Sequence, residues 1–392
     1  MNDIIIIGND HHNTLNTARC FGKEGISPYG IILCKNDIKH GFCELSRYWK
    51  KVWYLKEDEV VQFLLDSFLN HNPKPVLFPC CDTAAAIIDS QFNQLRHHFH
   101  MPSMSDKEGK IVELMDKAVQ VELARKYNLP MAKGWVINLL ETSYYPSDIV
   151  FPCIVKPLSS YEGEKADIRK IENSAELSQY LLVLKEKGYK RILVQEYLTF
   201  DFELEFVGCV SPTDNAFLIS RNIREWPIIG GTNSFFCIIN DPYVVSTCEK
   251  VMRLFQEMHY NGLFDVEMFY INGTIYINEF NWRNTGNIFF SHGTGVNYAV
   301  IWVFSQIGKD TSPFKHYCDD TNLYAMNEAT DIRHVVFSSL PFKEWNRDRK
   351  KTSSFALWYK GDMRPVIKRY FQLILRLFFN KRSRRKTANG KM

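Results

Sequence analysis

Several features are missing from this sequence of 392 residues, and each absence excludes a class of protein. The ten cysteines include no C-x-x-C pair, and the neighbours Cys80 and Cys81 cannot easily bridge each other, which favours a reducing compartment over a disulfide framework. No apolar run approaches the ~20 residues that a membrane-spanning helix needs. The first apolar segment is short and follows Asp3, so we expect no signal peptide. Together these absences predict a cytoplasmic protein.

Acidic residues are absent from the last thirty positions, Met363 to Met392, which carry ten Lys or Arg. Because the whole chain has a net charge of +4, the first 362 residues have a net charge of −6. Nucleic-acid-binding proteins carry positive charge on the folded body, whereas the body of this protein is mildly acidic. We therefore expect no nucleic-acid partner. The tail has an apolar, amphipathic helical segment, Val366–Phe379, followed by the basic run Lys381–Lys386, a combination that suits an anionic membrane surface. The alternative is a C-terminal helix docked on the body with a basic end.

The N-terminal part of the chain alternates between apolar strands and helices, which is typical of a doubly wound α/β layer. With 45% hydrophobic and 14% aromatic residues, the chain can bury a sizeable core. The first turn, Gly8-Asn9-Asp10, lacks the G-x-G-x-x-G pattern of a dinucleotide site. The expected strands are Ile4–Ile7, Tyr29–Leu33, Val52–Leu55 and Pro75–Phe78, and the expected helices are Asn13–Glu24, Glu57–Leu69 and one that follows Asp82.

A hairpin with an unusual set of polar residues is predicted around Asn272-Gly273, a strong turn signal with alternating apolar residues on both sides. Glu267 lies on the first strand, and Glu279 and Asn281 lie two residues apart on the second, so that their side chains share one face. Arg283 follows. Carboxylates this close are costly unless a cation lies between them, and oxygen-only ligands favour Mg²⁺. An ordinary solvated hairpin face is the alternative.

A second unusual feature is a lysine at the end of an apolar strand, Phe151–Pro157, whose last residues are Lys156 and Pro157. A strand that buries a lysine needs an anionic partner for the ammonium group, which makes Lys156 a candidate phosphate ligand. Upstream, Asp116-Lys117 opens a predicted helix. An amphipathic helix is also expected at Thr247–Tyr260, immediately before the hairpin.

The hairpin ending Glu-x-Asn-x-Arg, the strand-end lysine and Asp116-Lys117 together resemble the ATP-grasp superfamily. The resemblance is to the ATP-binding part of the carbamoyl phosphate synthase large chain and to D-aspartate ligase-like proteins, and it covers roughly residues 1–310. It implies ATP and Mg²⁺ (or Mn²⁺) as cofactors. By this resemblance the metal ligands are Glu267, Glu279 and Asn281, the phosphate-binding lysines are Lys117 and Lys156, and the catalytic residues are Arg283 and Lys156.

The remaining candidate residues also come from the resemblance. It assigns a phosphate loop, an adenine-binding hinge and a ribose-binding acid to Ser159, Ser160, Gln195, Glu196, Tyr197, Leu198 and Glu203, and substrate contacts to Arg221, Arg224, Gly230, Gly231 and His292. The loop departs from the family pattern, because residues 159–165 contain one glycine, Gly163. Alternation along the strand would also allow Glu203 and Glu205 to lie on a solvated face, and the two arginines and the histidine have ordinary structural alternatives.

The predicted fold is α/β, an ATP-grasp fold in which a Rossmann-like pre-ATP-grasp domain precedes two α+β subdomains that grip ATP. The predicted divisions are 1–104 for the first domain, 105–198 and 199–310 for the two subdomains, 311–365 for a C-terminal extension, and 366–392 for the basic tail. The implied function is a ligase that joins a small carboxylate to an amine through an acyl-phosphate. Two alternatives stay open: a carboxylating or phosphorylating ATP-grasp enzyme, and an inactive ATP-binding scaffold at a membrane surface.

Overall fold

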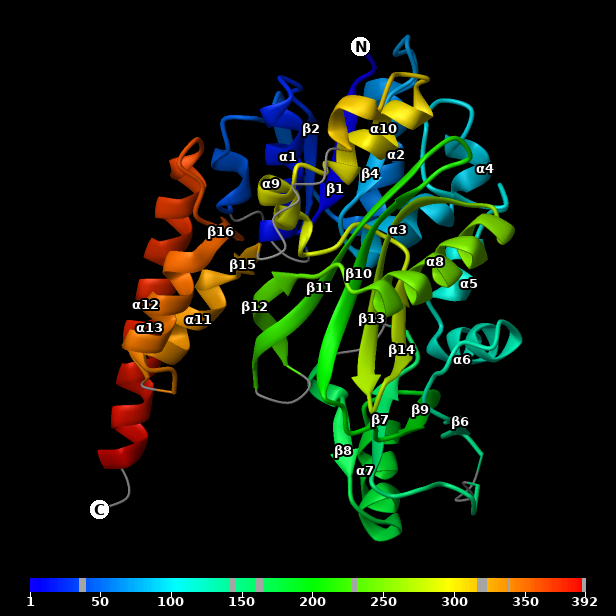
Figure 1. Cartoon of the computed structure of the whole chain (residues 1–392), viewed down its shortest axis with the longest axis vertical. Coiled ribbons are helices and arrows are strands. Elements are labelled where there is room, and N and C mark those ends of the chain that lie inside the picture. Colours follow the sequence, from blue (N-terminus) through cyan, green and yellow to red (C-terminus); the bar gives the residue numbers. More distant parts are fainter. Residues whose placement is uncertain are drawn as a thin grey trace.

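The N-terminal layer is a four-stranded parallel sheet in the order β3-β2-β1-β4 (Figure 1). The structure is a computed structural model that describes residues 1–34, 40–141, 146–159, 165–227, 231–315, 323–337 and 339–389, apart from the side chains of Lys165 and residues 377–389. All of β1 is buried, because helices cover both faces of the sheet. The predicted doubly wound layer is therefore confirmed. Its elements are β1 Ile4–Gly8, α1 His12–Lys23, β2 Tyr29–Leu33, β3 Lys51–Leu55, α2 Val60–Phe68, β4 Val76–Pro79, α3 Asp82–Asp89 and α4 Phe92–Leu95.

A small antiparallel sheet in the order β6-β9-β7-β8 forms the second layer. One face packs on α7 through a core that includes Val155, Leu177 and Val194. The backbone N–H of Lys117 donates to the carbonyl of Leu158, which ties the start of α6 to the end of β7. The elements are α5 Lys110–Leu114, α6 Lys117–Lys126, β6 Gly134–Asn138, β7 Cys153–Pro157, β8 Arg169–Ile171, α7 Ser174–Glu186 and β9 Arg191–Glu196.

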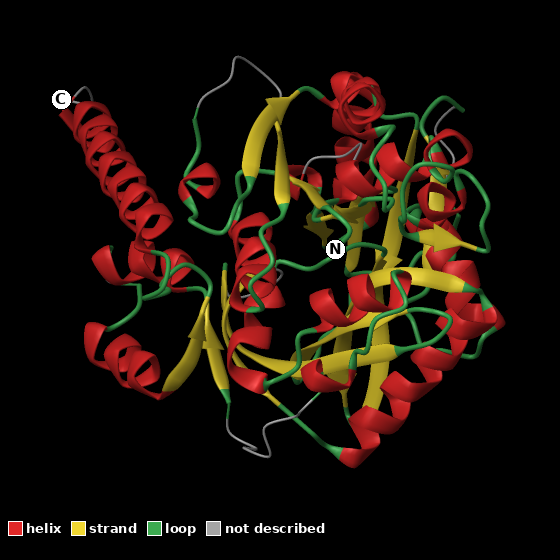
Figure 2. Ribbon diagram, turned by 90° about the horizontal axis from the view of Figure 1, so that it is seen from above, coloured by secondary structure: helices red, strands yellow, loops and turns green. Residues whose placement is uncertain are grey.

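The third layer is a large sheet in the order β14-β13-β10-β11-β12-β15-β16, crossed on one face by α8 (Figures 1 and 2). Leu204 and Phe206 of β10 pack against α8, so the intervening Glu203 and Glu205 point to the opposite face. Helix α8 begins earlier than the predicted Thr247, because Asp241 caps it and Pro242 occupies its first turn. The elements are β5 Ser103–Met104, β10 Phe202–Val210, β11 Asn215–Trp226, β12 Thr232–Ile238, α8 Pro242–Glu257, β13 Tyr260–Ile271, β14 Thr274–Asn281, α9 Ser291–Thr294 and α10 Tyr298–Gln306.

The C-terminal segments extend the large sheet and then turn back to the N-terminal layer. Strand β15 (Tyr324–Met326) pairs with β12, and β16 (Thr352–Phe355) pairs with β15. In the chain, helices α11 (Glu328–Val336) and α12 (Phe342–Lys351) come between these two strands, and α13 (Met363–Asn389) follows them. Just before α13, Asp362 forms a buried ion pair with Arg19 of α1, with 3.0 Å between Oδ2 and Nε. None of the described helices is long and apolar enough to cross a membrane.

Candidate ATP and metal site

A cavity of about 410 Å³ lies between the small sheet and the large one. Its walls come from β7 and β9 on one side and from β10, β13 and β14 on the other. A site of this size is within the range of small-molecule pockets. The predicted residues that line it are Lys117, Lys156, Ser159, Gln195, Glu196, Tyr197, Leu198, Glu203, Gly231, Glu267, Glu279, Asn281 and Arg283.

The predicted hairpin is confirmed as β13 and β14. Asn272 and Gly273 have positive φ angles of 46° and 84°, which a tight hairpin turn requires. Glu267 lies opposite Glu279, and Asp265 lies opposite Asn281. Val266, between Asp265 and Glu267, is buried in the core beneath α8, which directs the acidic side chains toward the cavity side of the sheet.

The carboxyl groups of this face make the site strongly acidic. Burial, followed by the charges of Glu279, Asp265 and Glu203, raises the pKa of Glu267 to about 8. Burial also raises the pKa of Glu205 well above its usual value, with Asp265 and Glu267 adding to the effect. These shifts mean that the face destabilises its own negative charge, and a bound cation would relieve this cost.

The chemistry of the donors fits a magnesium ion. Glu267, Glu279 and Asn281 offer carboxylate and amide oxygens from one face of the hairpin. Among the residues that the structure describes, no three His, Cys, Asp or Glu side chains converge as a complete metal cage. Mg²⁺ commonly uses one or two carboxylates and takes its remaining ligands from substrate phosphates and water, so two glutamates with an amide are a suitable set.

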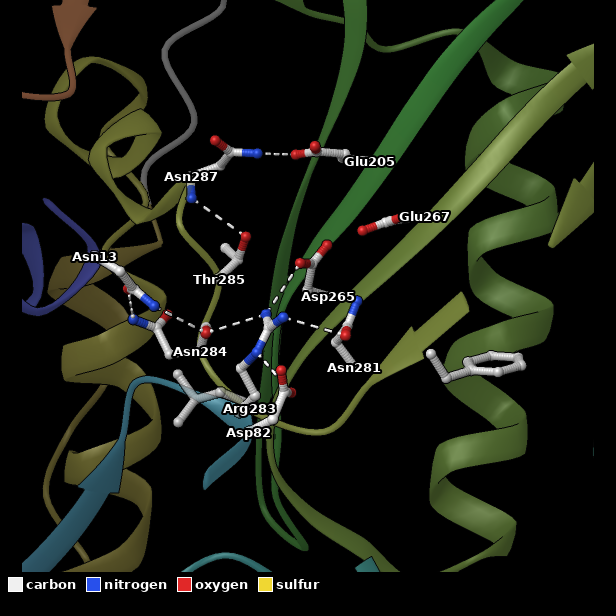
Figure 3. Close-up of polar contacts among 12 residues, drawn as sticks. Asn13, Asp82, Glu205, Asp265, Glu267, Asn281, Arg283, Asn284, Thr285 and Asn287 are labelled. Atoms are coloured by element: carbon white, nitrogen blue, oxygen red, sulfur yellow. Dashed lines mark hydrogen bonds and ion pairs between the residues drawn. The ribbon is translucent and has the colours of Figure 1, made fainter. Parts of the chain in front are cut away.

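Arg283 is held at the base of the hairpin by three side chains and by the carbonyl of Asn284 (Figure 3). Its Nε lies 3.0 Å from Asp82 Oδ1, and its Nη1 and Nη2 lie 3.2 Å from Asp265 Oδ2 and 3.1 Å from Asn281 Oδ1. Burial alone would lower the pKa of Arg283, but Asp82 and Asp265 raise it above its usual value. The guanidinium therefore keeps its charge and a fixed orientation beside the metal ligands.

Two lysines supply positive charge at the other side of the metal ligands. Lys156 is only 6% exposed at the end of β7, and burial lowers the pKa of its ammonium to about 8. Lys117, also 6% exposed, places Nζ 2.8 Å from Glu279 Oε1. Both lysines line the cavity, as expected for groups that receive phosphate.

One end of the cavity is apolar. Ile154, Ile168 and Met268 are among its lining residues, and Phe200 stacks on Phe269 with 4.5 Å between ring centroids. The segment Gln195–Leu198 at the end of β9, predicted as the adenine hinge, also lines the cavity. At the rim, Glu203 accepts a hydrogen bond of 2.9 Å from Asn222 Nδ2.

Three residues predicted to contact substrate lie outside the cavity lining. The guanidinium of Arg221 lies over the Phe202 ring, 3.9 Å from its centroid. Arg224 is paired with Asp331, at 2.7 Å between Nη1 and Oδ2, and with Asp348. The half-buried ring of His292 stacks on Tyr359 with 5.5 Å between ring centroids, and desolvation holds its pKa well below the usual value. These placements do not support the predicted contacts. Of the other predicted residues, Ser160 and Gly230 lie outside the described residues.

Sequence reasoning missed several lining residues. Glu205, which the alternation pattern also allowed on a solvated face, is only 7% exposed and accepts hydrogen bonds from Asn233 and Asn287. Asn222 and Asn233 line the cavity as well. The two-residue spacing of Glu203 and Glu205 could have identified Glu205, whereas the asparagines carry no local signal.

Comparisons with known proteins agree with this geometry. Residues 122–290 match the family model of the ATP-grasp domain. The chain thus contains an ATP-grasp domain at these residues. A search of curated protein sequences gave no match.

Solved structures share the fold along most of the chain. An ADP complex of PurK, an N5-carboxyaminoimidazole ribonucleotide synthetase, is 14% identical with a TM-score of 0.65, covering 86% of this chain and 85% of that one. Phosphoribosylglycinamide synthetase from Anaerococcus prevotii is 16% identical with a TM-score of 0.58, covering 83% and 80%. L-amino acid ligase from Bacillus licheniformis is 11% identical with a TM-score of 0.59, covering 79% and 75%.

Proposed function

We propose that this protein is an ATP- and Mg²⁺-dependent ligase that joins a small-molecule carboxylate to an amine. The observation that carries the proposal is the convergence on one cavity of two buried lysines, two hairpin glutamates and an oriented arginine. Opposed cations and acids of this kind suit phosphoryl transfer, in which positioning and charge neutralisation supply most of the catalysis. The similar folds named above, two synthetases and an amino acid ligase, support the same reaction class.

The reaction would take place in two steps. A carboxylate oxygen attacks the γ-phosphorus of ATP, so that ADP leaves and an acyl-phosphate forms. The amine nitrogen then attacks the acyl carbon, the C–O bond to phosphate breaks, and the nitrogen loses a proton as the amide forms. Lys117 and Lys156 would neutralise the transferring phosphoryl group, and Arg283 would stabilise charge on the acyl-phosphate.

The metal would be held by Glu267, Glu279 and Asn281. Mg²⁺, or Mn²⁺ in its place, supplies charge neutralisation and orientation of the phosphates when bound. The apolar end of the cavity would hold adenine between the segment Gln195–Leu198 and the Phe200–Phe269 stack, with Glu203 near the ribose.

The proposal also covers partners and location. We place the enzyme in the cytoplasm, with small-molecule substrates, no nucleic-acid partner, and peripheral membrane contact through the C-terminal tail.

We also propose the predicted domain boundaries, at residues 104, 198, 310 and 365, with one qualification. Because β15 and β16 continue the large sheet, the segment 311–365 is part of the second subdomain's sheet and not a separate appendage.

The test is an ADP-release assay with Mg²⁺, ATP and a mixture of amino acids and sugar acids. ADP formation that requires both a carboxylate and an amine supports the ligase. ADP formed without an amine would point to a carboxylating or phosphorylating enzyme, and tight ATP binding without ADP would point to a scaffold. Formation of the amide, followed by mass spectrometry, separates the ligase from futile ATP hydrolysis.

A further inference from the structure

The last helix, α13, contacts the body through its first turns and then extends away from it (Figures 1 and 2). Val366 is 1% exposed in a core shared with Leu15 and Phe42. Arg369 lies over the Phe42 ring, and the Tyr370 hydroxyl lies 3.5 Å from Glu328 Oε1. This anchorage holds the start of the helix against the N-terminal layer.

A second apolar face of α13 is exposed to solvent. Ile367, Phe371, Ile374 and Leu375 are 64%, 58%, 49% and 40% exposed, respectively. Spacings of four and three residues place Ile367, Phe371 and Ile374 in one stripe, on a different side of the helix from the buried Val366. We call these four residues the apolar stripe. A contiguous apolar patch that is exposed to water usually marks an interaction surface, so we expect the apolar stripe to have a partner.

The charge of the tail limits what that partner can be. From Met363 to Met392 there are ten Lys or Arg and no Asp or Glu, and the described part of α13 reaches Asn389, so most of this charge lies along one helix. Two copies joined through the stripe would bring two strongly positive helices together. A nucleic acid would satisfy the charge but leave the stripe in water. An anionic lipid surface satisfies both.

We propose that α13 docks the protein on an anionic phospholipid bilayer, with the apolar stripe in the interface and the basic residues against the lipid phosphates. The helix has 27 residues and would lie in the plane of the surface, since it is not apolar enough to cross a membrane. The body, with a net charge of −6 outside the tail, would be held off the surface by repulsion. This inference does not depend on the ligase reaction.

The experiment is co-sedimentation of the full chain with vesicles of phosphatidylcholine alone and of phosphatidylcholine with phosphatidylglycerol, at low and high salt. The stripe variant is Phe371→Ser with Ile374→Ser. The matched control is Phe342→Ser with Leu182→Ser, which removes one aromatic and one aliphatic side chain that are 64% and 62% exposed on the body. A third variant ends after Arg376, which removes six of the ten basic residues but keeps the anchored turns.

We expect the wild-type protein to pellet with the phosphatidylglycerol vesicles and to lose binding at high salt, because screening weakens exposed charges. The stripe variant and the shortened chain should each bind at least about tenfold more weakly, and the control should bind like the wild type. Circular dichroism confirms that each variant is folded. The proposal is overturned by equal pelleting of the wild type and stripe variant, by no pelleting at low salt, by stripe-dependent dimerisation in sedimentation velocity, or by RNA binding in place of vesicle binding.

Discussion

Lys117 Nζ lies 2.8 Å from Glu279 Oε1, although the two residues are 162 positions apart in the chain. Lys117 begins α6 beside the small sheet, and Glu279 lies near the end of β14 in the large sheet. The ion pair therefore spans the two walls of the candidate site. If a metal ion takes Glu279, the ammonium of Lys117 is left beside the space that the phosphates would fill.

Replacing Glu279 tests the metal site. Glu279→Gln removes a charged oxygen ligand and keeps the shape of the side chain, so ADP formation should fall by at least about 100-fold while the melting temperature changes little. A coupled ADP assay and a thermal melt measure the two effects. Glu122→Gln, at an exposed glutamate of α6 that pairs with Arg125, is the control. Turnover of Glu279→Gln at the wild-type rate would refute the metal assignment.

Replacing Lys156 tests the nucleotide site. Because this ammonium is buried at the end of β7, Lys156→Ala should lower the affinity for ATP by at least about tenfold, through loss of a charge-assisted contact. Titration calorimetry with a non-hydrolysable ATP analogue and Mg²⁺ measures the change. Lys185→Ala on α7 removes an exposed lysine and should bind as the wild type does. Equal affinities in both variants would argue against the phosphate role.

The ion pair of Arg19 and Asp362 should be a large contributor to stability. Asp362→Ala leaves Arg19, which is 0% exposed, without its carboxylate, and the expected loss is about 3–5 kcal/mol in the free energy of unfolding. Urea unfolding followed by circular dichroism measures it. Asp58→Ala, at an exposed position, should change stability by less than about 0.5 kcal/mol. A loss below about 1 kcal/mol for Asp362→Ala would show that the pair is not needed.

Glu328 should make stability depend on pH. Burial raises its pKa to about 7, above the value of about 4.3 for an unfolded chain, although hydrogen bonds from the backbone N–H groups of Trp358 and Leu357 lower it in part. The fold thus favours the protonated carboxyl, and the stability that this provides is complete below about pH 4.3 and is lost as the pH rises through about 7.

Glu328→Gln cannot ionise, so its stability relative to the wild type should increase between pH 5 and pH 8, by at most about 3 kcal/mol. Thermal melts of both proteins at several pH values measure this difference, and effects of other titrating groups cancel in it. A difference that stays constant with pH, or falls as pH rises, would contradict the assignment.

Local patterns were enough to predict the hairpin of β13 and β14 and the lysine of β7. The turn at Asn272-Gly273 fixes the register of its two strands, and a period of two then decides which side chains share a face. Lys156 was recognisable because a charge in an apolar strand needs a partner wherever the strand lies. The roles of these residues stay predictions until the variants are measured.

The positions of other residues depend on partners that are distant in the chain, so the sequence could not predict them. Arg224 pairs with Asp331 and Asp348, which are 107 and 124 residues further along the chain, and neither carboxylate has a local signal. His292 stacks on Tyr359 of a later segment. Strands β15 and β16 were not predicted, because they have only three and four residues, and short strands of this kind are specified by the sheet that they join.

The pairing of Arg19 with Asp362 also bears on the order in which the protein can be completed during synthesis. The N-terminal layer is made first, but the carboxylate that neutralises its buried arginine is made 343 residues later. The same late segment also covers the guanidinium, because the Leu357 carbonyl and the Tyr359 ring contact it. We therefore expect the surface of α1 around Arg19 to stay open to water until Asp362 has left the ribosome, and to close only when the last part of the chain docks.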